Sequence, residues 1–575
     1  MRVPRSWRVL VLLCSLGLVA AACGDDGGGT SSAGSSGTTG SGSGSSSSGS
    51  GRSGAAVATT TTLTPKKGGT ITISEFSAAG GLDPAKIGNS GTTGGNTALA
   101  IYDTLMGYNT TTGKYYGRTA QSLDASNADF TLWTLKLKSG IKFGDGTDYN
   151  ADAVKFSIDR ESKEGTPGPR SQLQTFVDTI TVVDPLTVTF KLKLGWAGFP
   201  SLLTGLPGVV YSPTQFAKVG DPAKFNLDPG PANAGAFNVK SYKPGESLEL
   251  VRNPNYYGGD VYLDGIKFVV LGSAASNLDA LTTNGIQATF VLDAAVIKKA
   301  VDAGFVKNAS VATPGNVIAM NSGEVPCKGG QPSVCAGKAD GETALVKTAT
   351  SDIRVRKAVV AAVDPKVINE RAYQGAANPS TSFFAGNPWD PKVAGPKYDP
   401  EAAKKLVTEA KAAGWDGKIR ILASNAPDGQ AWAQAVAAQL AAVGMTPDVD
   451  TTKTTAIIVP QVQIQRDYDL VTFAYAVLGD ADSAYPGLVA AFGSKDKRYG
   501  YGNAEMDAAI DLMRVSDTDA KRTDAFKKFT EIFNRDAPGA IITPLDYALV
   551  YTSKLQGVQR SAQAEFHFDK AWLNQ

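Results

Sequence analysis

The 575-residue sequence has little histidine and little cysteine: one histidine and four cysteines. The lone histidine, His567, lies a few residues from the C-terminus, which leaves no histidine elsewhere to serve as a general base or as a zinc ligand. This scarcity argues against most hydrolase mechanisms, although catalysis by carboxylates alone stays open. We therefore expect a protein that is not an enzyme, has no metal site and uses no cofactor.

A strong net charge is also missing. The chain carries 56 basic and 54 acidic residues. Residues 1–22 hold three arginines and no acid, so their removal would leave about one net negative charge. No cluster of lysine or arginine interrupts the body, and nucleic-acid binding needs such a basic surface. We expect no nucleic-acid partner, and membrane contact through a lipid anchor only.

Long apolar runs are absent after residue 22, so no membrane-spanning helix is predicted there. The first 22 residues combine three arginines, a short apolar stretch and Ala20–Ala22 directly before Cys23. This pattern resembles a bacterial lipoprotein signal peptide, residues 1–22, which is cut before the cysteine that receives the acyl chains. Two or more chains anchor a protein stably. An ordinary secretory signal is the alternative, since Ala20 stands where the family more often has leucine.

Residues 23–64 are predicted to be the lipidated Cys23 followed by a flexible tether. The segment is rich in glycine, serine and threonine, and such chains behave as flexible coils whose ends here would lie about 35 Å apart. The remaining body is too long for one hydrophobic core, so at least two lobes are expected.

Two cysteines remain once Cys14 leaves with the signal and Cys23 carries lipid. Cys327 and Cys335 are separated by a turn-like segment, and an even pair in an oxidising compartment favours a disulfide. We predict a local structural disulfide, with free thiols or a redox site as the alternative.

The body alternates strand and helix patterns, which predicts an α/β protein. Strands are predicted near 68–74, 130–137, 187–192, 247–251, 266–271 and 316–320. Helices are predicted near 151–160, 353–363, 400–413, 431–443 and 517–534. The apolar stripe of the helix at 431–443, which includes Trp432, is expected to pack in the core.

Several segments in one order resemble the large solute-binding proteins of peptide and nickel ABC importers. The most specific is Lys138–Thr147 with Ala151–Arg160. The others are Gly68–Thr70, Leu82–Pro84, Ile101–Leu105, Gly235–Phe237, Lys243–Glu246, Arg252–Tyr257, Asp352–Ala358, Tyr373–Gly375, Tyr398–Pro400 and Asp467–Leu470. The resemblance covers residues 65–560.

The resemblance implies a type II periplasmic-binding-protein fold with two lobes. Lobe I would comprise 65–311 and 541–575, and lobe II 312–540, with two strands crossing the hinge near 308–313 and 540–545. In such proteins the solute binds between the lobes, and hinge closure shields it from water. The implied partners are a peptide or other small solute and ABC permease subunits with their ATPases. We expect a monomer, lipid-anchored on the extracytoplasmic face of the bacterial cell membrane.

The resemblance also suggests ligand-binding residues. In peptide-binding relatives a strand ends in tryptophan, and an aspartate three residues later pairs with the ligand amine. Counting back from Phe492–Ser494 places Asp480 at that position, with Asp482 as a weaker candidate. Val477 occupies the tryptophan position, so an aromatic wall would come from Phe473 or Tyr475. A solvated acidic loop is the alternative for both aspartates.

A second family feature is missing. Dipeptide-binding relatives hold the ligand carboxylate with an arginine in a loop that here reads Ala423–Gln430 and contains none. This favours a longer peptide, or an amine-bearing solute without a carboxylate, over a free dipeptide. Asn425 is a candidate hydrogen-bonding residue, although a turn role is equally compatible. Phe76, Phe384 and Trp389 are candidate apolar cleft walls, with burial in the core as the alternative.

Three other functions stay open from the sequence alone. A tethered hydrolase would share the N-terminal signal, but the only histidine available to it is His567 near the C-terminus. A ligand-sensing surface receptor would need the same cleft as an importer. Nickel capture would need a chelating small molecule, because the chain has no histidines to spare.

Overall fold

The computed structural model describes residues 63–574, apart from 89, 478 and 496. The predicted signal peptide, Cys23 and all but the end of the tether lie outside these residues. Leu63–Gln575 forms one compact unit, and its secondary structure alternates helices and strands as predicted for an α/β protein. In the part of the chain that is described, no helix combines the length and the apolar character that crossing a membrane requires.

A ten-stranded sheet organises this unit, in the order β16-β15-β17-β12-β18-β11-β1-β10-β9-β8. The first half of the sheet comprises β1 (Thr70–Ser74), β8 (Phe237–Lys243), β9 (Ser247–Arg252), β10 (Gly265–Val269) and β11 (Ala288–Val291). The second half comprises β15 (Lys418–Ser424), β16 (Thr446–Lys453) and β17 (Leu470–Val477). In β1 the alternating pattern buries Ile71 and Ile73, as expected for a strand whose isoleucines face the core.

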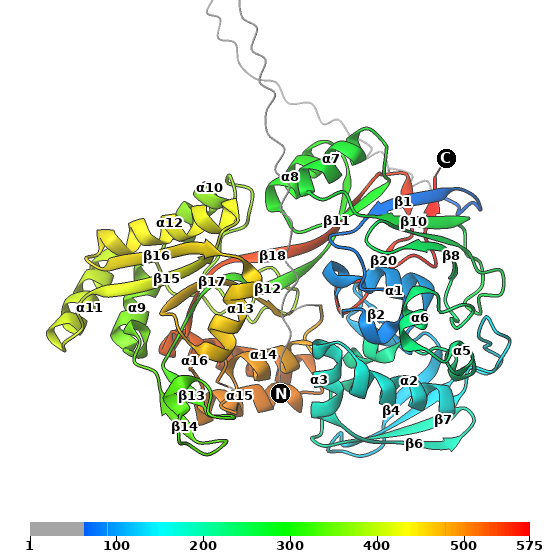
Figure 1. Cartoon of the computed structure of the whole chain (residues 1–575), viewed down its shortest axis with the longest axis horizontal. Coiled ribbons are helices and arrows are strands. Elements are labelled where there is room, and N and C mark those ends of the chain that lie inside the picture. The colour runs from blue at the N-terminus through cyan, green and yellow to red at the C-terminus, as the bar shows by residue number, and fades with distance from the viewer. Residues whose placement is uncertain (1–62, 89, 478, 496, 575) are drawn as a thin grey trace, which may run out of the picture. The chain divides into compact units, whose positions relative to one another are not determined.

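Two long strands connect the halves: β12 (Val306–Met320) and β18 (Gly539–Tyr551). They pair antiparallel with each other, while β18 continues to β11 and β12 continues to β17. Figure 1 shows both strands running between the two groups of elements. The register between them shifts from Ala312–Leu545 to Asn316–Thr543. Both predicted crossings fall in this pair, and the predicted lobe boundaries stay a prediction.

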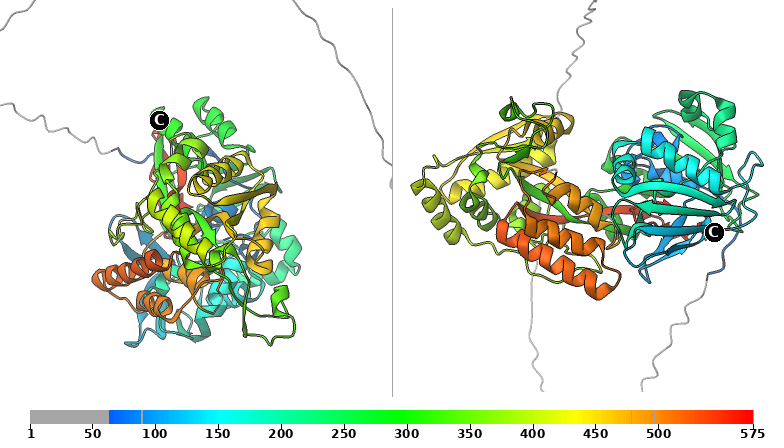
Figure 2. Two further views of the ribbon diagram at one scale, coloured as in Figure 1. Left: turned by 90° about the vertical axis from the view of Figure 1, so that its left-hand side faces the viewer. Right: turned by 90° about the horizontal axis from the view of Figure 1, so that it is seen from below.

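Helices cover both halves of the sheet (Figures 1 and 2). α7 (Ala274–Thr282) and α8 (Ala294–Asp302) pack beside β11 and β18, and α9 (Ile353–Ala362), α10 (Pro365–Ala372), α11 (Pro400–Ala412) and α12 (Pro427–Ala442) belong to the second half. α12 begins four residues earlier than predicted, since Pro427 occupies its first turn. Its stripe of Trp432, Val436 and Leu440 is buried, as predicted.

Further layers extend each half. A four-stranded sheet of β4 (Ala120–Ala125), β5 (Leu132–Leu137), β7 (Thr187–Leu192) and β6 (Val177–Asp184) packs with α2 (Ala151–Glu164) and α3 (Pro167–Phe176). Near the C-terminal end lie α14 (Ala484–Phe492), α15 (Ala504–Arg514) and α16 (Asp519–Asp536). A short hairpin of β13 (Glu324–Pro326) and β14 (Thr343–Leu345) carries the predicted Cys327–Cys335 disulfide.

A buried ion pair joins two of the segments on which the family resemblance rests. Arg160 of α2 donates to both carboxylate oxygens of Asp83, at 2.7 and 2.6 Å, and also to the Tyr211 hydroxyl at 2.8 Å. Its guanidinium lies 4.3 Å from the centre of the Phe216 ring. The bidentate geometry satisfies two buried charges that would be costly alone. These segments therefore hold the scaffold together.

Candidate functional site

A large cavity lies against β12 and β18, between the two halves of the sheet. Its volume is about 1100 Å³. The first half contributes the ends of β1 and β11 and the starts of α7 and α8, and the second half contributes the start of α12 and part of β17. Because β1, β10 and β11 are parallel, their carboxyl ends meet at one edge, where open α/β sheets bind ligands.

Aromatic side chains from both halves line this cavity. Phe76 follows β1 and is 53% exposed. Phe473 lies on β17, and Tyr373 and Trp432 come from the region of α10 and α12. Tyr373 and Trp432 are neighbours, with ring centres 6.5 Å apart. Such walls offer large apolar contact area and suit a solute with an organic body.

The cations that line the cavity already have acidic partners. Lys307 of β12 and Asp546 of β18 form an ion pair of 2.8 Å. Lys298 pairs with Asp302 at 2.7 Å along α8. No arginine lines the cavity in the part of the chain that the structure describes. A bidentate arginine clamp for a ligand carboxylate is therefore missing from this lining.

Three acids of the lining have no cation paired with them among the described residues. Asp293 caps α8 by accepting from the Val296 amide at 2.8 Å. Asp428 lies exposed in the first turn of α12. Glu75, directly after β1, is only 4% exposed. The lining thus contains more acidic than basic groups even without the charge of Glu75, which favours ligands that carry a cation.

Glu75 is the most buried of these acids. Its Oε2 accepts from Asn96 Nδ2 at 3.0 Å, and its Oε1 has no hydrogen-bond partner among the described residues. Asn96 is itself held, because its Oδ1 accepts from the Phe566 amide. Burial raises the pKa of the Glu75 carboxyl to about 8. An ionised Glu75 would therefore need a cation near Oε1.

The structure brings two of the predicted binding residues to this cavity, Phe76 and Phe473. Tyr475 is buried and packs against Phe492 and Tyr499, with ring centres 5.5 and 4.7 Å away. Asn425 is exposed outside the cavity lining, although its neighbour Ser424 belongs to the lining.

Phe384 and Trp389 also lie outside the lining. Their rings contact each other in a tilted arrangement, with centres 5.2 Å apart, and both contact Phe526 of α16, with ring centres 4.9 and 4.8 Å away, in the core. The alternative of core burial therefore describes this pair better than a cleft wall does. Only Ala385 and Gly386, between them in sequence, reach the cavity.

Asp480, which is buried, and Asp482, which is half-buried, form a separate acidic pair after β17. Asp480 is 2% exposed, accepts from the Ser483 amide at 2.7 Å, and has no described partner for its Oδ2. Asp482 accepts from the Tyr115 hydroxyl at 3.0 Å and lies 3.5 Å from Arg522 Nε. Burial and the neighbouring Asp482 raise the pKa of Asp480 to about 7. Neither aspartate lines the large cavity, and their binding roles stay predictions.

Comparison with known proteins decides the family. Residues 114–498, more than half of the chain, match the model for "Bacterial extracellular solute-binding proteins, family 5 Middle". The chain belongs to this family. The resemblance that the sequence motifs suggested is therefore confirmed, and the family consists of binding proteins.

Named relatives agree with this membership of family 5. The glutathione-binding protein GsiB of Salmonella typhi is 24% identical over 459 residues, which cover 77% of this chain and 84% of GsiB. Among solved structures, DppA of Helicobacter pylori in complex with the peptide STSA aligns with a TM-score of 0.68 at 18% identity, over 89% of this chain and 99% of DppA. NikA of Brucella suis in complex with Fe(III)-EDTA aligns with a TM-score of 0.70 at 21% identity, over 88% of this chain and all of NikA. These structures establish the two-lobed fold.

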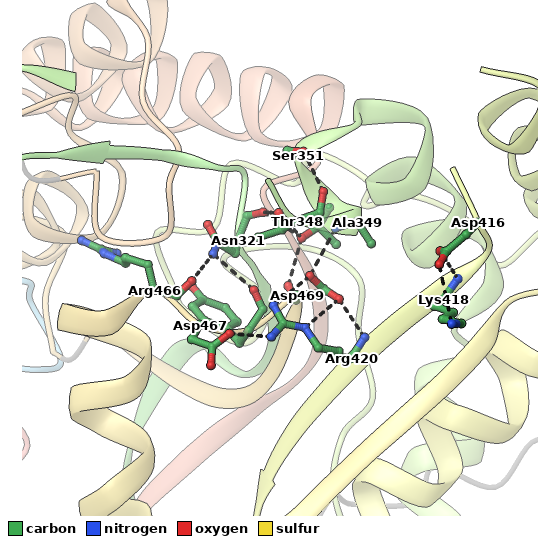
Figure 3. A network of polar contacts seen from close by, with 12 residues as sticks. Asn321, Thr348, Ala349, Ser351, Asp416, Lys418, Arg420, Arg466, Asp467 and Asp469 are labelled. Atoms are coloured by element: carbon green, nitrogen blue, oxygen red, sulfur yellow. Dashed lines mark hydrogen bonds and ion pairs between the residues drawn. The ribbon is translucent and has the colours of Figure 1, made fainter. Parts of the chain in front are cut away.

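One family-like segment of the chain, Asp467–Leu470, proves to be scaffold (Figure 3). Asp469 is buried and accepts from the backbone amides of Arg420 and Ala349, at 2.8 and 3.2 Å. The Arg420 side chain bridges Asp467 and Asp469. These contacts tie β15 to the start of β17, so the motif positions β17, which lines the cavity farther along.

Several lining residues were not predicted from the sequence as ligand-binding residues: Glu75, Asn277, Asp293, Lys307, Asn316, Tyr373, Asp428, Trp432 and Asp546. Glu75 carried one usable signal, because it directly follows a predicted strand, where open α/β sheets place ligands. Lys307 and Asp546 carried no such signal, since they lie in parts of β12 and β18 outside the predicted strands. Trp432 both packs in the core and borders the cavity.

Proposed function

We propose that this family 5 protein captures a peptide or peptide-like, amine-bearing solute in the 1100 Å³ cavity and delivers it to the permease of an ABC importer. The observation that carries the proposal is the cavity lining. Aromatic walls from both halves of the sheet surround an excess of acidic groups, while each lining lysine already has an acidic partner. Such a lining favours an organic solute with a positive charge.

The named relatives support this class of solute. GsiB is described as a glutathione-binding protein, and the solved DppA complex contains a peptide. A negatively charged metal chelate, such as the Fe(III)-EDTA of the NikA complex, fits this acidic lining less well because like charges repel. We therefore propose that the solute is a peptide or a peptide-like compound and not a metal chelate. Binding without catalysis is part of the proposal.

The site of action follows from the N-terminal signal. We propose that Cys23 carries lipid and that the tether holds the binding unit at the extracytoplasmic face of the membrane, as a monomer beside its permease. A tether raises the local concentration of the captured solute near the permease. Movement of Cys23→Ala protein from the membrane fraction to the soluble fraction would support the anchor.

A peptide-retention assay tests the proposed solute class. The purified full-length protein is incubated with a pool of tetrapeptides, separated from free peptide, and the retained peptides are identified by mass spectrometry. We expect selective retention of some members. If no tetrapeptide is retained at millimolar concentration while the protein is folded, the peptide-binding proposal is contradicted.

A further inference from the structure

Among the acids of the cavity, Glu75 has a combination of features that the others lack. It is 4% exposed, it borders the cavity, and its Oε1 has no hydrogen-bond partner among the described residues. Asp546 is paired with Lys307, Asp293 caps a helix, and Asp428 is open to solvent. A buried carboxylate oxygen without a partner is costly in an empty cavity, and a ligand that supplies a donor would remove that cost.

The position of Glu75 is held by the fold. Its backbone amide donates to Val269 O at 2.9 Å, which continues the pairing of β1 with β10. Its Oε2 is fixed by Asn96 of α1 (Gly95–Ile101), and Asn96 is fixed by the backbone of Phe566. The carboxyl group is thus held by one oxygen, and the other is left for a partner. Such preorganisation lowers the entropic cost of binding.

Asn277 and Phe76 line the same cavity on the side of the first half of the sheet. Asn277 borders the cavity and its Oδ1 accepts from Ser74 Oγ at 2.7 Å, so Asn277 and the end of β1 are joined. Phe76 presents an exposed ring next to Glu75 in sequence. An aromatic face can add a cation–π contact to a carboxylate contact. The chemistry of this corner suits an ammonium group at the end of an alkyl chain.

We infer that Glu75 is a subsite for a cationic side chain of the bound solute, so that the cargo class is a lysine-like peptide or amine. The inference rests on the proposed function and narrows it. It is independent of Asp480, which was predicted to receive the terminal amine of a peptide and lies outside the cavity lining. Burial holds the empty Glu75 largely protonated near neutral pH, since its pKa is raised to about 8; an incoming ammonium favours the carboxylate.

A matched set of peptides tests this inference. Tetra-alanine is varied at each of its four positions with lysine or with norleucine, which has the same chain without the charge, and binding to the full-length protein is measured by calorimetry. Every peptide keeps the same terminal amine and carboxylate, so only the side-chain charge differs. We expect at least one lysine peptide to bind about tenfold or more tightly than its norleucine counterpart, as for a desolvated charge pair.

Two variants then test whether Glu75 causes the preference for lysine over norleucine peptides. Glu75→Gln is expected to abolish the lysine preference and leave the norleucine peptide within about twofold, because only the charged partner is lost. Glu565→Gln is the matched control, because Glu565 is also a fully buried carboxyl with an unpartnered Oε1 and lies outside the cavity lining. It should keep the preference.

Each other outcome contradicts a distinct claim. Equal binding of lysine and norleucine peptides would overturn the Glu75 subsite and leave peptide capture intact. An equal loss in both glutamine variants would show a structural effect and also overturn it. Absence of any binding would contradict the proposed function itself. If Glu75→Gln does not fold, Glu75→Asp serves instead, because its side chain is shorter by one methylene and moves the carboxylate away from the ligand. An unchanged lysine preference in Glu75→Asp would overturn the subsite.

Discussion

At the scale of residues, the molecule places several acidic groups in surroundings that disfavour their charge. Glu75, Glu161, Asp480 and Glu565 are all buried, and burial is the largest cause that raises the pKa of each. Strongly shifted groups concentrate at functional sites, although structural networks shift them too. The cavity separates the cases: Glu75 borders it, and the other three do not.

A substitution at Asp480 tests the amine-binding role that the family resemblance assigns to this residue. Its Oδ2 has no described partner, so a ligand amine that reached it would form a buried pair. Asp480→Ala is expected to weaken binding of an amine-bearing peptide by on the order of 2 to 5 kcal/mol, measured by calorimetry. Unchanged affinity would remove Asp480 from the site and leave its role to the scaffold around Tyr115.

Glu565 allows a test of buried protonation by way of stability. Its pKa is raised to about 8 in the folded protein, so the folded state holds the proton more tightly than the unfolded chain does. The resulting stabilisation is present at acidic pH and is lost as the pH rises from the ordinary carboxyl pKa through 8. Relative to Glu565→Gln, the wild type should lose up to about 4 kcal/mol of unfolding free energy between pH 5 and pH 8.

Urea unfolding of both proteins at several pH values measures this difference. The glutamine variant cannot ionise at this position, so all other titrating groups cancel in the comparison. Parallel pH profiles for the two proteins would contradict the raised pKa.

At the scale of elements, the pairing of β12 with β18 determines where the two halves of the sheet meet. Gly315 lies in the register shift between these strands, with a φ of +76°. A Cβ atom at this position would lie 2.3 Å from Thr543 O and 2.7 Å from Leu545 N. Both contacts are to backbone, which cannot move away as a flexible side chain could. Glycine is therefore required for close approach as well as for conformation.

Gly315→Ala is expected to destabilise the protein by about 1 to 3 kcal/mol, since both strain and backbone crowding oppose it. Gly304→Ala is the matched control: its φ is +89°, but no atom lies within 4 Å of the added Cβ. Denaturant unfolding compares the two. Equal destabilisation would show that the positive φ alone, and not the contact with β18, accounts for the cost.

Much of this architecture could be predicted from the sequence, and the failures have physical causes. The helix predicted at 400–413 is observed at Pro400–Ala412, and the strand at 187–192 is observed with those bounds, because capping residues and alternation are local signals. The full lengths of β12 and β18 were not predicted, because Pro314 and Pro544 interrupt their apolar runs. Both prolines lie where the register shifts, so the ladder continues on either side of them.

The site was less predictable because partners distant in the chain decide which side chains reach it. Phe384 and Trp389 are enclosed by Phe526, far along the sequence. Lys307 and Asp546 meet only through the pairing of β12 with β18. The family resemblance pointed to Asp480, whereas the cavity lining pointed to Glu75. The three-dimensional arrangement places Glu75 beside the cavity and Asp480 outside its lining, and the binding role of Asp480 stays a prediction.

At the scale of the whole molecule, the fold joins two halves through β12 and β18, and the cavity lies against both strands. A solute that contacts both halves would stabilise the arrangement in which they approach, because binding shifts the equilibrium toward the state it prefers. Hinge closure of this kind is the expected behaviour of a two-lobed binding protein.

Small-angle scattering tests closure. Addition of a tetrapeptide that the protein binds is expected to lower the radius of gyration of the ligand-free protein. An unrelated peptide that does not bind should leave the radius of gyration unchanged. Identical scattering curves with and without a saturating ligand would contradict closure, although capture in the cavity would remain possible.

Native mass spectrometry of protein purified without refolding shows whether the cavity captures an amine-bearing solute. We expect a non-covalent adduct whose mass matches an amine-bearing peptide or peptide-like compound. Ala474→Trp should lose the adduct, because Ala474 is exposed in the cavity lining and a tryptophan there would occupy the ligand volume. Val449→Trp, at an exposed position of β16 outside the lining, should retain it. Absence of any adduct from the wild type, or full retention of the adduct by Ala474→Trp, would contradict capture of an amine-bearing solute in the cavity.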